Sequence, residues 1–326
     1  MEEVNGKLAT ALINYTRELG YKFPISKVSH IDTDVLIERI NHCIENNLRY
    51  DIDLFNLSAM QKMSNYDFGR IIYLIKLTLD DINYQYIDNL KRVSSDIVSR
   101  KKGKVFSFEE HLECLILSMI SNNRWGNLNI EKNSKRIKDI FCNYDRKLLK
   151  CLNKDKTISD LRKIQCTDIS IEKQIDSIPC NIEIFEKIES EYGSLDNYIT
   201  KVSPIKIKNS FYEGKYKLKQ IGYAVTSDYL NKVGIDIGKS SNQLSILFGA
   251  TRLAIIENDL VTSKQQLMII KRLANLNNMF EVEVQWIINQ FYEQICAKSN
   301  EDASVCIKCR LNCLCKRFIQ KVSKKI

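Results

Sequence analysis

Apolar residues recur at intervals of three or four positions over most of the chain, and this spacing predicts a protein built almost entirely from α-helices. Few strong turn signals interrupt the pattern, because only 3 prolines and 11 glycines occur among 326 residues. Asp34, Ser64 and Ser107 have side chains that cap helix N-termini, and each stands near the start of an apolar pattern. We expect helices at residues 33–47, 64–99, 106–121, 134–152, 181–195, 263–276 and 281–296.

One basic segment, SRKKGKV at residues 99–105, divides the chain into two regions. Residues 1–104 form an expected helical region to which the sequence assigns no role. The chain after this segment reads as one continuous unit without internal repeats or low-complexity tracts.

The composition indicates a protein of a reducing compartment. No apolar run approaches the ~20 residues that a membrane-spanning helix needs, and the N-terminal segment is acidic and amphipathic, unlike a secretion signal. Eleven cysteines without such a signal predict free or metal-bound thiols, not a disulfide scaffold. We therefore expect a cytoplasmic protein that does not associate with membranes.

The net charge of +9 favours a polyanionic partner. Lysines and arginines concentrate at residues 100–104, between residues 206 and 219, and in the tail at residues 316–326. Each run taken alone is also typical of a solvated helix face. Together they predict a surface that contacts phosphates.

Four cysteines near the C-terminus carry the most specific chemistry. Cys296, Cys306, Cys309 and Cys315 form a C-x9-C-x2-C-x5-C pattern, and four thiolates in one short segment can ligate one compact inorganic centre. A tetrahedral zinc site usually takes two C-x2-C pairs, and only one is present here. The pattern therefore favours a [4Fe-4S] cluster, with zinc or unligated thiols as alternatives. Cys313 lies inside the segment and leaves open whether it replaces Cys315 as the fourth ligand.

Three further segments, in this order, resemble the helix-hairpin-helix (HhH-GPD) DNA glycosylase superfamily, in its endonuclease III-like iron–sulfur branch. The segment LECLILSMISNNRW, residues 112–125, resembles the opening helix, and Asn122 and Asn123 fall where the family places glutamines. The segment YKLKQIGYAVTSDYLNKVG, residues 216–234, resembles the hairpin L-P-G-V-G-x-K-T-A. Gly222 matches its second glycine, while Lys219 and Gln220 replace the proline and the first glycine.

The helix leading into the cysteines, residues 282–296, resembles the helix before the cluster loop of that family. The usual ligand spacing there is C-x6-C-x2-C-x5-C, so only the first gap is longer here, and a longer loop adds only a slowly growing closure entropy. The resemblance covers about residues 105–318.

The resemblance implies an all-α, two-lobed fold. Residues 105–250 would form the barrel lobe that carries the hairpin, and residues 251–326 would add C-terminal helices, the four-cysteine iron–sulfur loop and a basic tail. The implied activity is base excision repair: a monomer binds double-stranded DNA, flips a damaged base out and hydrolyses its N-glycosidic bond. The implied DNA-contacting residues are Asn122, Asn123, Lys219, Gln220, Gly222, Ala224 and Lys239, with an asparagine filling the gap left by the base.

The catalytic positions of the family are altered in this chain. Ala224 stands where bifunctional members carry a hairpin lysine, so we expect a monofunctional enzyme if the chain is active. A register that matches Lys239 places Ser241 at the essential aspartate, and a serine is uncharged at neutral pH. A shifted register makes Asp236 the catalytic acid, although Asp236 could equally cap the next helix.

These departures leave three hypotheses open. The chain is a DNA glycosylase with relocated catalytic groups, a catalytically inactive DNA-binding relative of the same fold, or a zinc-stabilised helical interaction module that does not use nucleic acid. The histidines do not supply the missing chemistry, and we expect His111 on an exposed face at the start of the opening helix.

Overall fold

A computed structural model describes residues 65–121, 126–166, 171–256, 258, 261–300 and 304–323. Within these ranges every regular element is a helix, so the predicted all-α class is confirmed. No helix in the described ranges is both long enough and apolar enough to span a membrane. The predicted helix at residues 33–47, the caps Asp34 and Ser64, and the expected DNA-contacting Asn122 and Asn123 lie outside the described residues.

The chain divides into two compact units, one formed by residues 89–239 and the other by residues 1–88 together with 240–326. The domain boundaries expected from the sequence lie after residues 104 and 250. The structure places them after residues 88 and 239, because α4 (Asn65–Asp81) packs against α17 (Ser263–Asn277) and α18 (Glu281–Phe291), far along the sequence. Helix α16 (Asn242–Phe248) also packs against α17 and α18.

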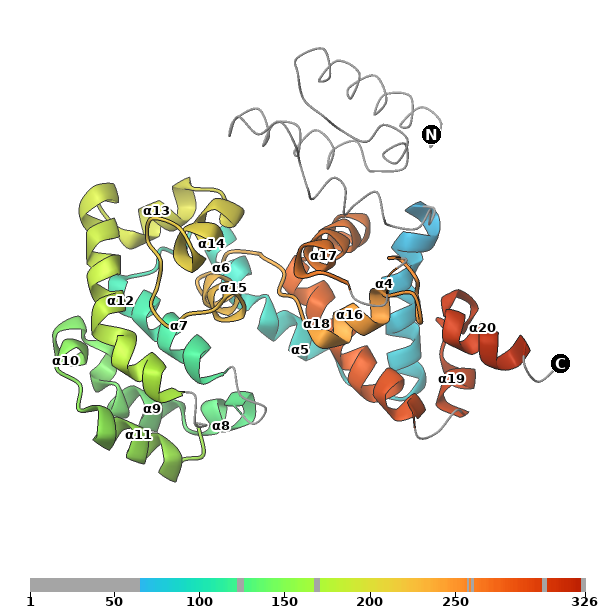
Figure 1. Cartoon of the computed structure of the whole chain (residues 1–326), viewed down its shortest axis with the longest axis horizontal. Coiled ribbons are helices and arrows are strands. Elements are labelled where there is room, and N and C mark those ends of the chain that lie inside the picture. Colours follow the sequence, from blue (N-terminus) through green and yellow to red (C-terminus); the bar gives the residue numbers. More distant parts are fainter. Residues whose placement is uncertain are drawn as a thin grey trace, which may run out of the picture. The chain divides into compact units, whose positions relative to one another are not determined.

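The C-terminal part of that unit is a series of short helical turns. Helix α18 continues directly into a π-helix, η3 (Tyr292–Ala297), and the 3₁₀ turn η4 (Lys298–Asn300). Then follow α19 (Ser304–Lys308), η5 (Asn312–Leu314) and α20 (Lys316–Ser323). Figure 1 shows this segment in red beside α4, and hydrogen bonds from Arg310 to Thr78 and Asp81 hold it there.

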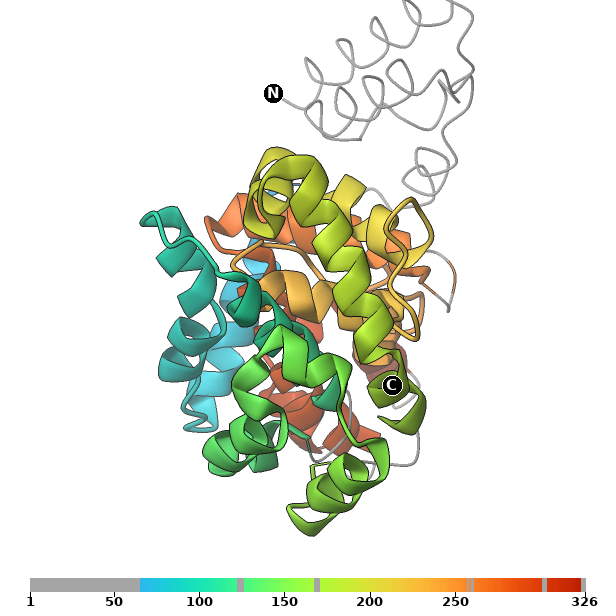
Figure 2. The same cartoon turned by 90° about the vertical axis from the view of Figure 1, so that its left-hand side faces the viewer.

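The unit of residues 89–239 contains ten helices of the described chain, beginning after α5 (Ile87–Val93), which crosses the boundary. They are α6 (Ser95–Lys101), α7 (Phe108–Ile120), α8 (Gly126–Lys132), α9 (Ser134–Ile140), α10 (Arg146–Lys150), α11 (Lys154–Lys163), α12 (Ile171–Tyr192), α13 (Leu195–Lys201), α14 (Pro204–Tyr212) and α15 (Tyr223–Lys232), with the short turn η2 (Cys142–Tyr144) between α9 and α10. Figure 2 views this unit from the front.

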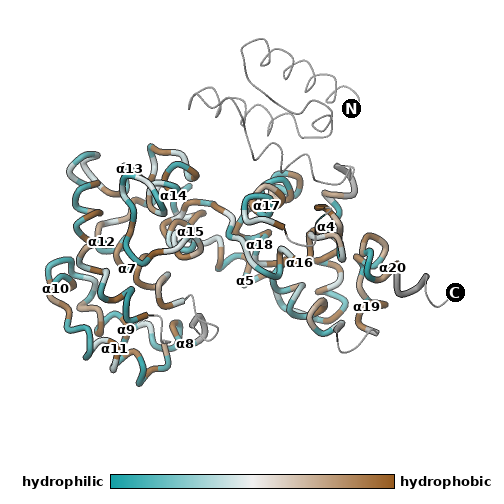
Figure 3. Tube along the Cα trace, in the orientation of Figure 1, coloured by the Kyte–Doolittle hydropathy of each residue, from teal (hydrophilic) through white to brown (hydrophobic). Residues whose placement is uncertain are grey.

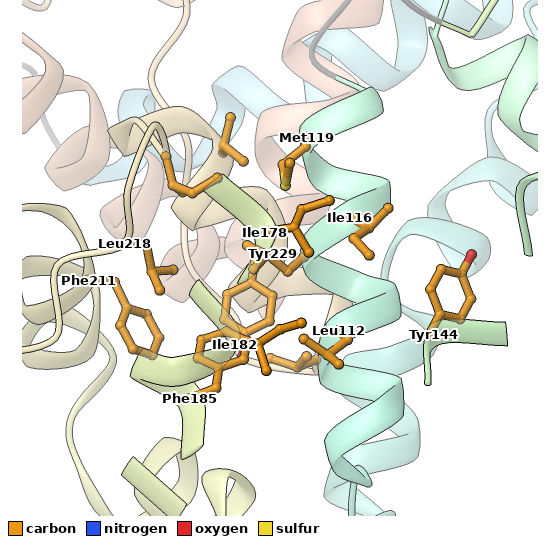
Figure 4. Close-up of a cluster of buried hydrophobic side chains, with 14 of the residues drawn as sticks. Leu112, Ile116, Met119, Tyr144, Ile178, Ile182, Phe185, Phe211, Leu218 and Tyr229 are labelled. Atoms are coloured by element: carbon orange, nitrogen blue, oxygen red, sulfur yellow. The ribbon is translucent and has the colours of Figure 1, made fainter. Parts of the chain in front are cut away.

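The core of this unit forms where α7, α12, α14 and α15 meet. Tyr229 on α15 is completely buried and lies among Leu112, Ile182, Phe185 and Phe211 (Figure 4). Along these helices hydrophobic and hydrophilic residues alternate at helical spacing, as the hydropathy colouring of Figure 3 shows. Burial of the apolar face therefore fixes how the hairpin helix α15 is placed within its unit.

Local sequence signals set the helix ends. Ser107 caps α7 as predicted, because its hydroxyl accepts from the Glu110 N–H at 3.1 Å while the Glu110 carboxylate accepts from the Ser107 N–H at 2.8 Å. The predicted helix over 134–152 is interrupted at η2, where Cys142, Asn143 and Tyr144 have φ values of 52°, 53° and 60° in the left-handed region. The predicted helix over 64–99 is likewise split into α4, α5 and α6, with Asn83 at φ 55° after the first. Asparagine tolerates this conformation better than most residues, which accounts for Asn83 and Asn143 but not for Cys142 and Tyr144.

The prediction that His111 is exposed is wrong, because its side chain is fully buried. Its Nε2 lies 3.1 Å from the Asp196 carboxylate and its Nδ1 lies 2.8 Å from the Tyr229 hydroxyl. Arg100 also pairs with Asp196 at 2.6 Å. Because a carboxylate only accepts, Nε2 carries the proton and Nδ1 accepts from Tyr229.

These contacts tie α6, α7, α13 and α15 together through one buried polar network. Burial lowers the pKa of His111, which keeps the imidazole neutral, although the contact with Asp196 opposes this. Burial would raise the pKa of Asp196, but the hydrogen bonds from His111 and Arg100 outweigh it and lower that pKa to about 2. Since every member is satisfied within the core, the network is a structural one.

Candidate functional site

The four predicted ligands, Cys296, Cys306, Cys309 and Cys315, line one cavity. Cys296 lies in the π-helix η3, Cys306 in α19, and Cys315 directly before α20. The first three are less than 10% exposed and Cys315 is half-buried. The remaining walls of this cavity are mostly apolar and are formed by Leu247, Leu253, Phe291, Ile295, Leu311 and Phe318. The short helical turns of this segment thus place all four cysteines along the wall of one cavity.

Cys313 is not part of this cavity. Its side chain is exposed, and its sulfur lies 3.8 Å from the Arg310 carbonyl oxygen. The structure therefore directs Cys315, and not Cys313, toward the other three cysteines.

Successive tight turns shape the cysteine segment. The Cys309 N–H donates to the Cys306 carbonyl, the Asn312 N–H to the Cys309 carbonyl, and the Cys315 N–H to the Asn312 carbonyl. The Arg310 N–H donates to the buried Thr78 hydroxyl at 3.0 Å, and its guanidinium pairs with Asp81 at 2.7 Å. Helix α4 therefore anchors the loop, which explains why the domain boundary differs from the predicted one.

The π-helix also positions Cys296. It inserts extra backbone into the end of α18, and such insertions change the direction in which the following side chains point. Cys296 is buried within it, on the side of the cavity.

Burial dominates the electrostatics of the cysteine cavity. Burial raises the pKa of the Cys296 thiol to about 12, although the charge of Arg252 opposes this, and burial raises the pKa of Cys309 to about 11. Without a metal these thiols would stay protonated at neutral pH. A metal reverses this, since it binds the thiolate and displaces the proton. The donor set therefore fits a thiolate-bound centre.

In the part of the chain that the structure describes, no three Cys, His, Asp or Glu side chains lie close enough together to hold one metal ion. One tetrahedral zinc ion requires sulfurs roughly 3.8 Å apart, given bonds near 2.3 Å. Side chains can line one cavity with their sulfurs farther apart than this distance. The shared cavity of the four cysteines is therefore compatible with the absence of a group close enough to hold one ion.

The predicted hairpin consists of α14, a turn at residues 213–222, and α15. Residues 216–220, where the resembled segment begins, are not helical, and the first helix of the pair is α14. Gln220 has φ 57°, the left-handed conformation that glycine adopts most readily. This is the position where the resembled hairpin carries its first glycine.

Gly222 is the N-cap of α15 and is exposed. It provides no side chain to cap the first N–H groups of the helix, and Ala224 follows within the first turn. A Cβ built at Gly222 would meet no protein atom within 4 Å. The fold itself therefore does not require glycine at this position.

A buried asparagine holds the turn in place. Asn181 on α12 accepts from the Lys219 N–H at 2.7 Å and donates to the Lys219 carbonyl at 3.1 Å. Gln174 donates to the Gln220 carbonyl at 3.4 Å. The side chains of Lys219 and Gln220 point out of the core and are exposed.

The expected catalytic positions lie in two different units. Ser241 is the N-cap of α16, where its hydroxyl accepts from the Leu244 N–H at 3.2 Å and donates to Asn289 at 3.1 Å. The interpretation that Asp236 caps this helix is therefore wrong. Asp236 is half-buried in the non-helical segment between α15 and α16.

Sequence reasoning missed a second carboxylate, Asp228, on the hairpin helix α15. Ser121 donates to it at 2.9 Å, Lys232 pairs with it at 2.8 Å, and the Lys239 amine lies 4.0 Å away. Burial would raise the pKa of Asp228, but the charges of Lys232 and Lys239 lower it overall, so the carboxylate is ionised at neutral pH. The i, i+4 pair with Lys232 is visible in the sequence, whereas Ser121 and Lys239 meet it only in the fold.

Comparison with known protein families, with characterised proteins and with solved structures found no significant match to this chain.

Proposed function

We propose that this protein binds duplex DNA through the hairpin of α14 and α15, holds a [4Fe-4S] cluster on Cys296, Cys306, Cys309 and Cys315, and acts as a monofunctional DNA glycosylase of the base-excision type. The observation that carries the DNA-binding part is the turn itself. Gln220 takes up a glycine-like φ, and an uncapped helix begins two residues later at an exposed glycine.

The phosphate contact follows from this geometry. The first N–H groups of a helix and its positive end attract an anion, and such contacts position a duplex without reading its sequence. Since no protein atom needs the space above Gly222, its lack of a side chain is best explained by a group that approaches from outside. Exposed Lys219 adds a charge beside the same turn.

The cofactor proposal rests on the convergence of four thiols at one cavity together with the C-x9-C-x2-C-x5-C spacing. When bound, a cluster would cross-link η3, α19 and the segment before α20, and so fix a loop that has little core of its own. Zinc remains the alternative occupant, and absorbance separates the two because only an iron–sulfide centre has a broad band near 400 nm.

The proposed reaction is hydrolysis of the N-glycosidic bond of a flipped base. The bond from C1′ to the base nitrogen breaks, a water oxygen bonds to C1′, and the proton of that water leaves with the base. A carboxylate assists by stabilising the positive charge that develops at C1′. Asp228 is the stronger candidate for this carboxylate than Asp236, because its surroundings keep it ionised and Ser121 links it to the end of α7.

Gly222→Ala tests the DNA-binding part. The φ of −83° at Gly222 is open to alanine and the space is empty, so the variant should fold as stably as the parent. We expect its affinity for a 20-base-pair duplex, measured by fluorescence anisotropy, to fall about tenfold, since one lost charge-assisted contact amounts to roughly 1.5 kcal/mol. Lys219→Met should weaken binding and reduce its salt dependence, whereas Lys135→Met, the same charge change on α9, should not. Unchanged affinity in Gly222→Ala would refute the hairpin as the interface.

Abasic-site formation on duplexes that contain a panel of damaged bases tests the enzymatic part. Asp228→Asn should abolish the activity, and Asp236→Asn should retain it. Tight binding without cleavage of any duplex would establish the non-catalytic alternative. A colourless protein that contains zinc and does not bind DNA would establish the interaction module.

A further inference from the structure

Arg252 is a buried cation at the wall of the cysteine cavity. It lies in the turn that follows α16, and only 4% of its surface is exposed. Its guanidinium donates to the Ser299 hydroxyl at 3.4 Å and to the Cys296 carbonyl at 3.3 Å. Its own carbonyl accepts from the Lys316 N–H at 2.8 Å. Arg252 therefore touches the backbone at both ends of the ligand segment, next to the first cysteine and next to the last.

Two hydrogen bonds engage the guanidinium of Arg252 without offsetting its charge. Both acceptors are neutral, one a hydroxyl and the other a carbonyl. Among the described residues that line the cavity there is no carboxylate, and the other groups are thiols, apolar side chains, Ser299 and Asn312. A guanidinium this deeply buried is destabilising unless an anion compensates it.

The thiol cavity accounts for the missing negative charge. Four thiolates carry more negative charge than the inorganic core they enclose carries positive charge, so the bound centre is anionic. Its reduction adds one more electron, and a fixed positive charge nearby favours that step. Arginine suits this place because it stays protonated and its planar group reaches two acceptors at once.

We propose that Arg252 is the counter-cation of the metal–thiolate centre, which it retains in the protein and whose reduction it favours. This inference rests on the proposed cofactor. In this role Arg252 is a positioning residue that acts through the four cysteines, and it is not a catalytic residue.

The test compares three variants of the full chain purified without oxygen. Arg252→Met removes the charge at similar length, Arg252→Lys keeps the charge, and Lys308→Met removes an exposed charge next to Cys309. Iron, acid-labile sulfide and helix content are measured for each. A redox titration followed by electron paramagnetic resonance then gives the potential, and the decay of absorbance near 400 nm in air gives the lifetime of the cluster.

For Arg252→Met we expect the equilibrium constant for reduction of the cluster to fall at least tenfold, which lowers the one-electron reduction potential by about 59 mV. We also expect this variant to lose the cluster faster in air. Arg252→Lys should stay near the parent potential, and Lys308→Met should match the parent in both measurements because water screens an exposed charge. If Arg252→Met holds no cluster at all, retention by Arg252→Lys still supports the role of the charge.

Two results would overturn the inference. In one, Arg252→Met behaves like Lys308→Met. In the other, Arg252→Lys fails as badly as Arg252→Met, which would assign the effect to hydrogen bonding. A parent protein without iron and sulfide would instead refute the proposed cluster. If the parent protein contains zinc, its zinc affinity is measured by competition with a chelator in place of the reduction potential. We then expect Arg252→Met to bind zinc more weakly than the parent, and Arg252→Lys and Lys308→Met to bind it about as tightly.

Discussion

Asn181→Ala provides a quantitative test of how the hairpin is held. Asn181 is 1% exposed, and its amide makes two hydrogen bonds to the backbone of Lys219, at 2.7 and 3.1 Å. A typical hydrogen bond contributes about 1 kcal/mol net, and a buried group left unpaired costs about 1–3 kcal/mol. Because Lys219 is exposed, water can hydrogen-bond in part to the Lys219 N–H and carbonyl groups that lose their partner in Asn181→Ala. We therefore expect the free energy of unfolding to fall by about 2–3 kcal/mol.

The assay has two parts. Urea unfolding followed by circular dichroism gives the stability, and anisotropy with a labelled duplex at a temperature where the variant is folded gives the affinity. We expect the affinity to fall because the turn before Gly222 is no longer fixed. Ser177→Ala is the matched control: Ser177 contacts the Asn181 amide at 3.3 Å but not Lys219. It should lose about 1 kcal/mol of stability and keep its affinity. A loss of stability in Asn181→Ala with no change in affinity would mean that the turn does not contact DNA.

Three further predictions concern the cysteine segment, the strained turn and the buried network. Cys313→Ser should retain the iron and sulfide content of the parent and Cys315→Ser should lose it, and equal retention in both would contradict the assignment of ligands. Gln220→Gly should raise the urea midpoint slightly, because relief of a left-handed conformation worth about 1–2 kcal/mol exceeds the entropy that glycine adds to the unfolded chain. Stability should decline as the pH falls from about 4 to about 2, since the pKa of Asp196 is 3.8 unfolded and about 2 folded. Protonation of His111 in the unfolded chain adds a decline that begins at higher pH, and urea midpoints across this range for the parent and Asp196→Asn will show whether the network is responsible.

The helical class and the start of α7 could be predicted because both depend on neighbours in the sequence. The spacing of apolar residues in α4 and α17 is a local property, and the capping box at Ser107 involves only Glu110. The grouping of the four ligand cysteines was also accessible, because three of them lie within ten residues.

The features that sequence reasoning missed all depend on groups that meet from distant segments. His111 was predicted to be exposed because its buried partners, Asp196 on α13 and Tyr229 on α15, lie far from it in the sequence. Asp228 became a candidate only when Ser121 and Lys239 were found beside it. The division of the chain was misplaced because the partners of α4 lie nearly two hundred positions later in the chain. Periodicity shows that a face is buried, but it does not show which helix covers it.

The π-helix at the end of α18 has a consequence for how genetic change can act on the cysteine centre. Deleting one residue between Tyr292 and Ile295 would let the segment wind as an ordinary α-helix, leaving the apolar face of Val284, Ile287 and Phe291 in register upstream. Because one turn of a π-helix holds about one residue more than one turn of an α-helix, the segment downstream would keep nearly its present direction. The same deletion within α18 would instead turn everything downstream by about 100° and take Cys296 away from the cavity. The π-helix is therefore the part of this continuous helix where the loss of one codon would disturb the arrangement of the cysteines least.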